Sequence, residues 1–359
     1  MIRIKVTLII LLLFFSNLYS QSFINKIKVP IYYTSSMSIG YDSNVFRLSD
    51  IDLKIDTNND IINSKTFDGA YLNPKIDLKY SPYLLKNIIT QFNFSFGRNH
   101  YLNSSDKSYD IFYSELGFKF DSYHWLKLSH RFIPKYYLRN YIDSDYSDFQ
   151  NIACTFSIET INLSYSRAIN ELGWARVRFA QTNWLYNEHF TEYDTKISLI
   201  ELKYFFKGFK ASNNLWYSYS KADNSSYNTG YNSTNIDRSF NEHNWGVSSK
   251  IRARHIIKTN IIDNIGFSLL VKNRIYNMES RDDFDFWQYE NYNGREHLET
   301  NFSFWIDKKI NNQLTNQIKF KYRIRNVESV YDWIRDHKGF NKYEIIYKFS
   351  INSDLGWLY

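Results

Sequence analysis

The sequence predicts an all-β fold, namely a transmembrane, antiparallel, up-and-down β-barrel of about fourteen strands with both chain ends on the periplasmic side. Three observations lead to this prediction. Apolar and polar residues alternate with a period of two along most of the chain, as in strands whose two faces meet different solvents. Aromatic residues make up 19% of the sequence, yet the mean hydropathy is −0.48. The first residues have the form of a secretory signal peptide.

Residues 1–20 form the predicted signal peptide. A short basic region precedes an apolar run over residues 6–15, and small and polar residues follow up to the expected cleavage after Ser20. The apolar run is too short to cross a bilayer as a helix, and no Cys follows the cleavage site to carry a lipid anchor. Residues 21–359 are assigned to the barrel domain.

Composition narrows the class of protein. With 12 Gly and 4 Pro, the chain has too little of either residue for a collagen-like or disordered protein. The low mean hydropathy argues against a helical membrane protein. A β-barrel accounts for this low value, because half of the residues in each strand face water. The net charge is +7, but Lys and Arg are spread among the strands, so nucleic acid is not an expected partner.

The stretch 343–359 has the clearest alternation. One face is apolar and aromatic from Tyr343 to Tyr359, and the other is mostly polar. A chain that ends in this way resembles outer-membrane β-barrel proteins, whose last strand closes the barrel and whose terminal aromatic residue carries the assembly signal. The resemblance implies that Leu355, Trp357 and Tyr359 form this signal and that the barrel-assembly machinery reads it.

A second resemblance lies near the start of the mature chain. After an expected first strand at 31–41, residues 40–47 read Gly-Tyr-Asp-Ser-Asn-Val-Phe-Arg. This stretch is similar to the start of several outer-membrane β-barrel porin families and, more weakly, to the barrel part of surface lipoprotein assembly modifiers. It implies a porin-like barrel in the bacterial outer membrane. The helical repeats that precede the barrel of the modifiers are not found here, which puts their lipoprotein-handling role in doubt.

The remaining strands follow from the same alternation. They are expected at 71–80, 88–101, 109–120, 125–138 and 149–167, near 175–179, 200–206, 215–219, 245–251, 265–271 and 298–306, and at 314–325 and 343–359. On strand 125–138 the expected outward residues include Leu126, Leu128, Phe132 and Tyr136. The exact limits of strand 71–80 are less sharply predicted, because it contains Pro74 and proline donates no ladder hydrogen bond.

Long and short connections should alternate, as they do in outer-membrane barrels. The long outer loops are expected at 48–68, 222–238 and 279–294. Residues 149–167 form either one strand or a hairpin that turns near 159–162, and a single strand preserves the alternation of the connections. Cys154, the only cysteine, lies in an apolar run of this segment and is predicted to be a small lipid-facing residue.

Alternation alone does not say which face meets the lipid. A soluble barrel or sandwich would turn its apolar residues toward its own core and its polar residues outward. The signal peptide, the terminal aromatic residue and the aromatic surplus favour the membrane arrangement.

No catalytic or metal-binding motif is present. The eight His residues are scattered without metal-ligand spacing, and no nucleophile elbow or phosphate-binding loop occurs. The series Asp56, Asn58, Asp60 imitates the first ligands of a calcium loop, but Ile61 and Phe67 occupy the positions of its Gly and Glu. An ordinary acidic loop is the better interpretation, and no cofactor is expected.

Positive charge on the inward faces carries the functional prediction. If the apolar residues of each strand face outward, the residues between them face the lumen; we call this alternation the parity of the strand. It places the following candidates in the lumen: Lys127, Arg131, Arg176, Arg178, Lys250, Arg252, Arg254, Lys272, Arg274, Lys319, Lys321, Arg323 and Arg325. Rings of Arg and Lys in a watery pore attract anions. The alternative is that these cations pair with inward carboxylates and form ladders between strands. Large aromatic residues near strand ends are predicted to form an interfacial girdle rather than a sugar-stacking track: Tyr80, Trp125, Trp174, Trp184 and Trp216.

These observations predict a passive, weakly anion-preferring, porin-like channel of the bacterial outer membrane, and not an enzyme. Its expected partners are outer-membrane lipid, the barrel-assembly machinery and small anionic solutes. Two alternatives remain: a non-conducting barrel that exports or assembles a surface polysaccharide or lipoprotein, and an outer-membrane hydrolase.

Overall fold

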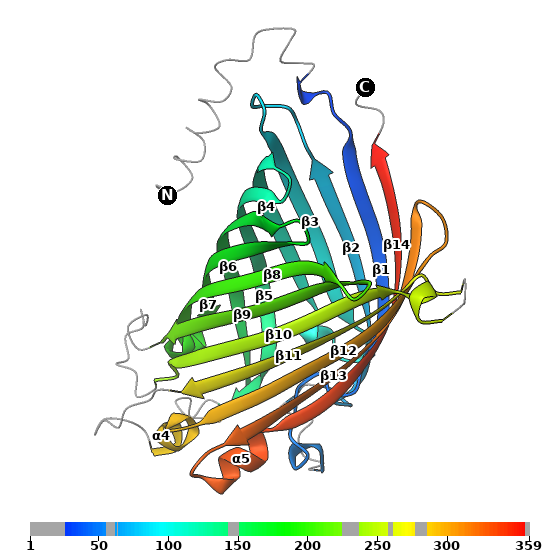
Figure 1. Cartoon of the computed structure of the whole chain (residues 1–359). Helices are drawn as coiled ribbons and strands as arrows, with labels where there is room; N and C mark the ends of the chain where they lie inside the picture. Colours follow the sequence, from blue (N-terminus) through cyan, green and yellow to red (C-terminus); the bar gives the residue numbers. More distant parts are fainter. Residues whose placement is uncertain are drawn as a thin grey trace.

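The computed structural model describes residues 26–54, 62, 64–142, 151–224, 237–257, 261–276 and 286–355. In these ranges fourteen antiparallel strands form one closed barrel (Figure 1). Each strand pairs with its neighbours in the sequence, and β1 pairs with β14 to close the sheet. The predicted up-and-down barrel of about fourteen strands is therefore confirmed.

The strand bounds agree with the alternation in the sequence. The strands are β1 Ile31–Asp42, β2 Gly69–Tyr80, β3 Ile89–Tyr101, β4 Tyr109–Asp121, β5 His124–Ile142, β6 Asn151–Asn170, β7 Gly173–Tyr186, β8 Thr195–Gly208, β9 Ala211–Asp223, β10 Phe240–Arg252, β11 Asn264–Tyr276, β12 Glu296–Lys309, β13 Leu314–Glu328 and β14 Phe340–Leu355. Of the predicted segment 149–167, residues 151–167 belong to a single strand, as predicted, and residues 149 and 150 lie outside the described residues. Pro74 lies within β2, where the pairing with β3 skips Asn73 and Pro74.

Most turns are tight at the end of the barrel where β1 begins and β14 ends, and longer connections lie at the opposite end (Figure 1). We call these the termini end and the loop end. At the termini end, Phe209 and Lys210 connect β8 to β9 with φ values of 54° and 57°, the left-handed conformation that matches the twist of a two-residue hairpin. Two connections at this end are longer: residues 81–88 join β2 to β3, and the connection between β10 and β11 contains the short helix η5, Ala253–His255.

Short helices lie in the loop-end connections: η1 Asp52–Lys54, η3 Ser105–Lys107, η4 Glu188–Tyr193, α4 Phe286–Tyr292 and α5 Asp332–Lys338. None of the helices in the described ranges is long and apolar enough to cross a membrane. Several loop-end residues are buried, including Leu48 and Ile334. Lys107 is also buried and donates hydrogen bonds to the carbonyl oxygens of Tyr137 and Leu138 at 3.0 and 2.7 Å.

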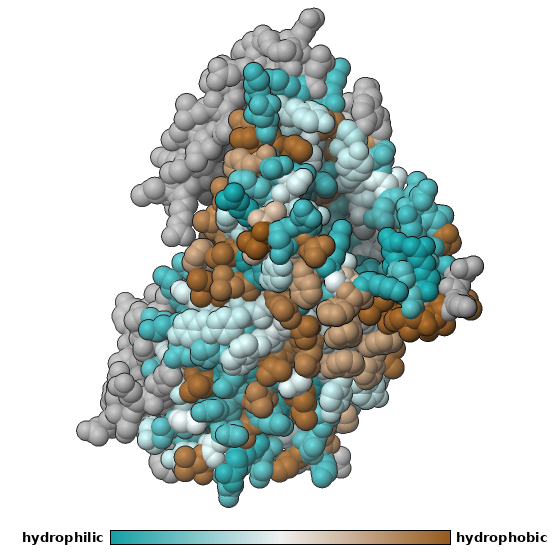
Figure 2. All heavy atoms as spheres, in the orientation of Figure 1, coloured by the Kyte–Doolittle hydropathy of each residue, from teal (hydrophilic) through white to brown (hydrophobic). Residues whose placement is uncertain are grey.

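The barrel is apolar outside and polar inside. Ile318, Phe320 and Tyr322 of β13 lie in register beside Tyr347, Ile345 and Tyr343 of β14, and all six are more than a third exposed. Hydrophobic side chains are spread over the barrel wall in Figure 2. The inward residues between them are polar and less accessible, as Glu299 and Asn244 illustrate, with 4% and 7% exposure. This distribution is the opposite of a soluble barrel, whose apolar residues face the core.

Strand β5 departs from the predicted parity. Its pairing with β6 shifts between Ile133 and Tyr136 and again between Tyr137 and Arg139. A bulge adds a residue to one strand and so moves the following side chains to the other face. Tyr136, predicted to face outward, instead packs on the inner side against Tyr109 and Phe156, with ring centroids 5.1 and 5.3 Å away.

The prediction that Cys154 faces lipid is wrong. Cys154 is 1% exposed and packs with Tyr186 and Phe190, on the same face of β6 as the lumen residues Thr160 and Asn162. The apolar run of β6 supplies an aromatic cluster inside the loop end of the barrel, and that packing explains its hydrophobicity.

The predicted aromatic girdle is also wrong for four of its five residues. Tyr80 faces outward and packs near Phe92, but Trp125, Trp174, Trp184 and Trp216 lie on inward positions of their strands. Trp216 is paired in register with Gly246 and lies over it, in space that a Cβ atom on Gly246 would occupy. Trp305 lies over Gly266 in the same way. Glycine on the neighbouring strand lets a large indole lie flat against the inner wall.

This arrangement predicts the effect of Gly246→Ala. The added methyl group overlaps the Trp216 indole, so the ring must move, and we expect a loss of about 1 to 3 kcal/mol of stability. The change is measured by thermal unfolding of the purified protein in detergent, monitored through the heat-dependent shift of its mobility on a gel. Gly208→Ala is the matched control, because its new methyl group meets only the Phe206 ring at an ordinary 3.6 Å. Equal melting temperatures for the two variants would contradict this account of the glycine.

Candidate functional site

The strand registers bring most of the predicted cations to the inner wall. Lys127 and Arg131 lie on β5, Arg176 and Arg178 on β7, Lys250 and Arg252 on β10, Lys272 and Arg274 on β11, and Lys319, Lys321, Arg323 and Arg325 on β13. Arg254 differs from the prediction, since it lies in η5 beyond the end of β10 and not on a strand. The strand pattern ends at Arg252 because the chain turns there.

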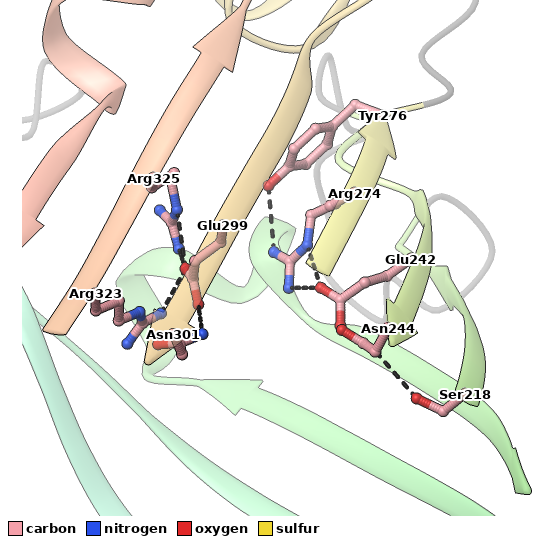
Figure 3. A network of polar contacts seen from close by, with 9 residues as sticks. All are labelled: Ser218, Glu242, Asn244, Arg274, Tyr276, Glu299, Asn301, Arg323 and Arg325. Carbon is pink, nitrogen blue, oxygen red and sulfur yellow. Dashed lines mark hydrogen bonds and ion pairs between the residues drawn. The ribbon is translucent and has the colours of Figure 1, made fainter. Parts of the chain in front are cut away.

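Two arginines of β13 share one carboxylate of β12. Nη2 of Arg323 and Nη2 of Arg325 donate to the same oxygen of Glu299 at 2.6 and 2.8 Å, and Asn301 donates to its other oxygen at 3.1 Å (Figure 3). The Glu299 side chain is only 5% exposed. Two guanidinium groups around one carboxylate leave an excess of positive charge.

A second carboxylate shared by two arginines lies between β7 and β8. Arg176 and Arg178 of β7 donate to the two oxygens of Glu201 on β8, at 3.1 and 2.9 Å. Glu201 is buried, whereas each arginine side chain is about a third exposed. The shared carboxylate is therefore less accessible than the two guanidinium groups that bind it.

Other cations each bind a carboxylate on a neighbouring part of the wall, as the alternative interpretation requires. Arg274 donates to Glu242 at 2.7 Å and approaches the Tyr276 hydroxyl at 3.4 Å (Figure 3). Further pairs are Lys127 with Glu115 at 2.8 Å, Lys250 with Asp307 at 2.6 Å and Lys321 with Glu344 at 3.0 Å. Part of the predicted charge is therefore neutralised within the wall.

A third group of cations has no ion pair among the described residues. Lys272 and Arg131 belong to it, as do Lys319 and Lys203. Lys319 lies over the Trp305 ring with 5.5 Å between its Nζ and the ring centroid, and Lys203 lies 4.8 Å from the Trp216 centroid. These contacts retain the positive charge while covering the aliphatic stem. The sequence pattern predicts Lys319 in the lumen but does not single out Lys203. The signal for Lys203 is its position between the outward residues Leu202 and Tyr204 of β8.

Lys342 was also missed. It donates to Asp42 of β1 at 2.5 Å and lies 3.6 Å from Glu344. Its side chain is 6% exposed, so it connects β14 to β1 rather than lining open space. Pairing between the first and last strands is invisible to a strand-by-strand analysis of charge.

Arginines also gather at the loop end, outside the strands. Arg295 is 4% exposed and lies over the rings of Tyr276 and Tyr292, at 4.1 and 4.7 Å from their centroids. Arg238 lies over Tyr186 and donates to its hydroxyl at 3.0 Å. Burial, together with the nearby charges of Arg139 and Arg295, lowers the pKa of Lys338 in α5 to about 7. Burial and the neighbouring arginines thus disfavour the charged form of Lys338 at this position.

The described residues contain no group of three or more His, Cys, Asp or Glu that is arranged to hold a metal ion. Asp56, Asn58 and Asp60, which imitate a calcium loop in the sequence, lie outside the described residues.

Comparison with known proteins adds the fold context. No protein-family model matches the chain, and a search of curated proteins finds no match. Among solved structures, it is similar to a loop deletion mutant of OmpT, an outer membrane protein of Vibrio cholerae, at 9% identity and a TM-score of 0.44 over 90% of this chain and 99% of that chain. It is also similar to an anion-selective porin from Comamonas acidovorans, at 7% identity and a TM-score of 0.44 over 90% and 98% of the two chains.

A third similar structure is OprD from Pseudomonas aeruginosa, at 9% identity and a TM-score of 0.39 over 90% of this chain and 95% of that chain. All three likenesses are remote. Conclusions about solute and mechanism therefore depend on the wall of this chain alone.

The shared carboxylate predicts the effect of Glu299→Gln. Arg323 and Arg325 would lose their common anionic acceptor, and breaking such a buried pair costs about 3 to 5 kcal/mol. We expect a lower melting temperature in detergent. Glu328→Gln makes the same change at the loop end of β13, where no ion pair to a described residue is found, and should leave the melting temperature close to that of the wild type. A Glu299→Gln protein as stable as this control would show that the shared pair contributes little.

Proposed function

We propose that this chain is a bacterial outer-membrane β-barrel that acts as a passive, weakly anion-preferring, porin-like channel. The observation that carries the proposal is the sharing of carboxylates in the inner wall. Arg323 and Arg325 share Glu299, and Arg176 and Arg178 share Glu201. Lumen cations without an ion pair among the described residues, such as Lys203 and Lys319, add to the excess.

The closed sheet with an apolar exterior supports the membrane location. In hydrocarbon every backbone N–H and C=O must be satisfied within the protein, and a closed barrel satisfies them without leaving an edge. The outward aromatic and aliphatic residues then contact lipid, and the inward polar residues contact water. Closure of the sheet meets the first requirement, and the alternation of side chains meets the second.

The proposed orientation places the termini end in the periplasm and the loop end at the cell surface, because inner turns of such barrels are short and outer loops long. Leu355 is the last described residue of β14 and pairs with Ile31. Trp357 and Tyr359 of the proposed assembly signal, the signal peptide 1–20 and most of the loop 222–238 lie outside the described residues.

The preference for anions should be weak. Several wall cations are neutralised by direct ion pairs, and the remaining charge is screened over about 10 Å at 0.1 M salt. A positive wall lowers the energy of an anion in the lumen without forming a tight binding site. The selectivity should therefore decrease as the salt concentration rises.

One observation favours the non-conducting alternative, in which the barrel exports or assembles a surface polymer or lipoprotein. Aromatic side chains pack inside the loop end, where Phe240 and Tyr276 form a buried cluster with Ile197 and Ala222. Such packing narrows the lumen at that end. Conductance measurements separate the two functions.

The test is the reversal potential of single channels in planar bilayers under a KCl gradient. We expect wild-type protein to favour chloride, and the double substitution Arg323→Glu, Arg325→Glu to shift the potential toward potassium, because it replaces two wall cations with carboxylates.

The double substitution Arg254→Glu, Lys86→Glu is the matched control. It makes the same change of charge in termini-end connections, at one residue in η5 and one exposed residue before β3, and should shift the potential less. Absence of conductance in the wild type, or equal potentials in wild type and the wall variant, would overturn the proposed function.

A further inference from the structure

A recess in the inner wall is lined by aromatic and small polar side chains as well as cations, and a channel that selects anions by charge alone would not need the aromatic side chains. It has a volume of about 580 Å³ and is lined mainly by β4 to β7. The size falls within the range of sites for small organic ligands. Its lining combines aromatic rings, positive charges and small polar side chains.

Flat aromatic surfaces form the first component. Tyr123, Trp125 and Trp174 line the recess. The Trp174 ring stacks on Phe205 with centroids 3.7 Å apart and an interplanar angle of 11°, and Tyr123 stacks near Trp174 at 6.0 Å and 19°. Phe205 thus supports the Trp174 ring from one side and fixes its orientation.

Positive charge is the second component. Lys79, Lys127, Arg131, Arg176 and Arg178 all line the recess. Among the described residues that line it, Glu115 is the one carboxylate. Glu115 is already occupied, because it accepts hydrogen bonds from Asn93, Tyr113 and Lys127 at 2.7, 2.6 and 2.8 Å. Little negative charge remains to compete with a bound anion.

The arginines have donors to spare. Arg176 and Arg178 each use one Nη2 atom to bind Glu201. The Nε atoms of both are buried and have no hydrogen-bond partner among the described residues. A buried Nε–H group does not reach a ligand, but each side chain is about a third exposed, so Nη donors that Glu201 does not use are accessible to a carboxylate ligand.

Hydroxyl and amide groups are the third component. Thr160, Asn162, Ser164 and Ser166 occupy successive inward positions of β6 and line the recess. Asn162 donates to the Ser129 hydroxyl at 3.2 Å, and its own carbonyl oxygen has no partner among the described residues. This row presents both donors and acceptors along one strand.

We propose that this recess binds an acidic saccharide, a short chain of sugars that bears carboxylates. The C–H face of a sugar ring packs on Trp174, the hydroxyl groups bind the β6 row, and a carboxylate binds Arg131 and the free donors of Arg178. A small inorganic anion would not use the rings, and a neutral sugar would not use the cations.

The inference rests on the proposed function in one respect, since the saccharide reaches the recess through the lumen. It extends that function by naming the solute class that the wall retains. Binding itself requires no current through the channel.

The test compares trigalacturonate with maltotriose, a neutral trisaccharide. Isothermal titration calorimetry on the full-length protein in detergent measures binding, and block of single-channel current in planar bilayers measures access from the lumen. We expect trigalacturonate to bind at least about tenfold more tightly, the effect of one charge-assisted hydrogen bond.

Variants separate the components of the recess. Trp174→Leu should weaken the binding of trigalacturonate, and Arg178→Gln should remove most of its advantage over maltotriose. Trp305→Ala is the matched control, because it removes another inward tryptophan, on β12, that does not line the recess. It should bind trigalacturonate like the wild type. Heat-modifiable mobility verifies that each variant is folded, and Arg178→Lys replaces Arg178→Gln if the latter does not fold.

The outcomes distinguish this inference from the proposed function. Calorimetric binding without conductance would support the recess and overturn the channel. Anion-selective conductance with equal binding of the two sugars, or with unchanged binding in the folded Trp174 and Arg178 variants, would overturn the recess and leave the channel intact.

Discussion

Backbone pairing between β1 and β14 closes the sheet, and the arrangement of every side chain depends on that closure. A closed sheet leaves no unpaired edge, so each strand presents one face to the outside and one to the inside. Side chains reinforce the joint: Lys342 of β14 binds Asp42 of β1, and the Thr34 hydroxyl donates to Asn352 at 2.6 Å. A shift of one residue in this register would exchange the lipid and lumen faces of a strand.

The polar interior follows from the same constraint and produces the functional chemistry. Inward cations cannot all be neutralised by neighbouring strands, because the carboxylates on those strands are fewer. The wall responds by placing one carboxylate between two arginines, at Glu201 and at Glu299, and by laying lysines over tryptophan rings. Repulsion within the wall is reduced while positive charge remains available to solutes.

The period of two was enough to predict the strands and, for most of the barrel, the alternation of long and short connections. It failed where a local interaction outweighed the period. The bulges in β5 redirected Tyr136. Cys154 instead keeps the inward face of Thr160 and Asn162, and aromatic packing at the loop end makes that part of the inward face apolar, so residue type alone points to lipid. For Trp174 and Trp216, a place near strand ends favours an interfacial girdle, whereas their alternation with outward neighbours places them on the inner face. The partners that hold them, Phe205 and Gly246, lie on neighbouring strands and become evident only once the register is known.

The central claim is that the polar face of each strand lines water and the apolar face meets lipid. Cysteine accessibility on β13, in a Cys154→Ser background reconstituted in lipid bilayers, tests it directly. Cysteines at Gln317, Lys319 and Lys321 should react with a charged, water-soluble thiol reagent. Cysteines at Ile318, Phe320 and Tyr322 should resist it, and a fluorophore attached there before reconstitution should be quenched by nitroxide-labelled lipid. The reverse pattern, or equal reaction at all six positions, would contradict a membrane barrel with a polar lumen.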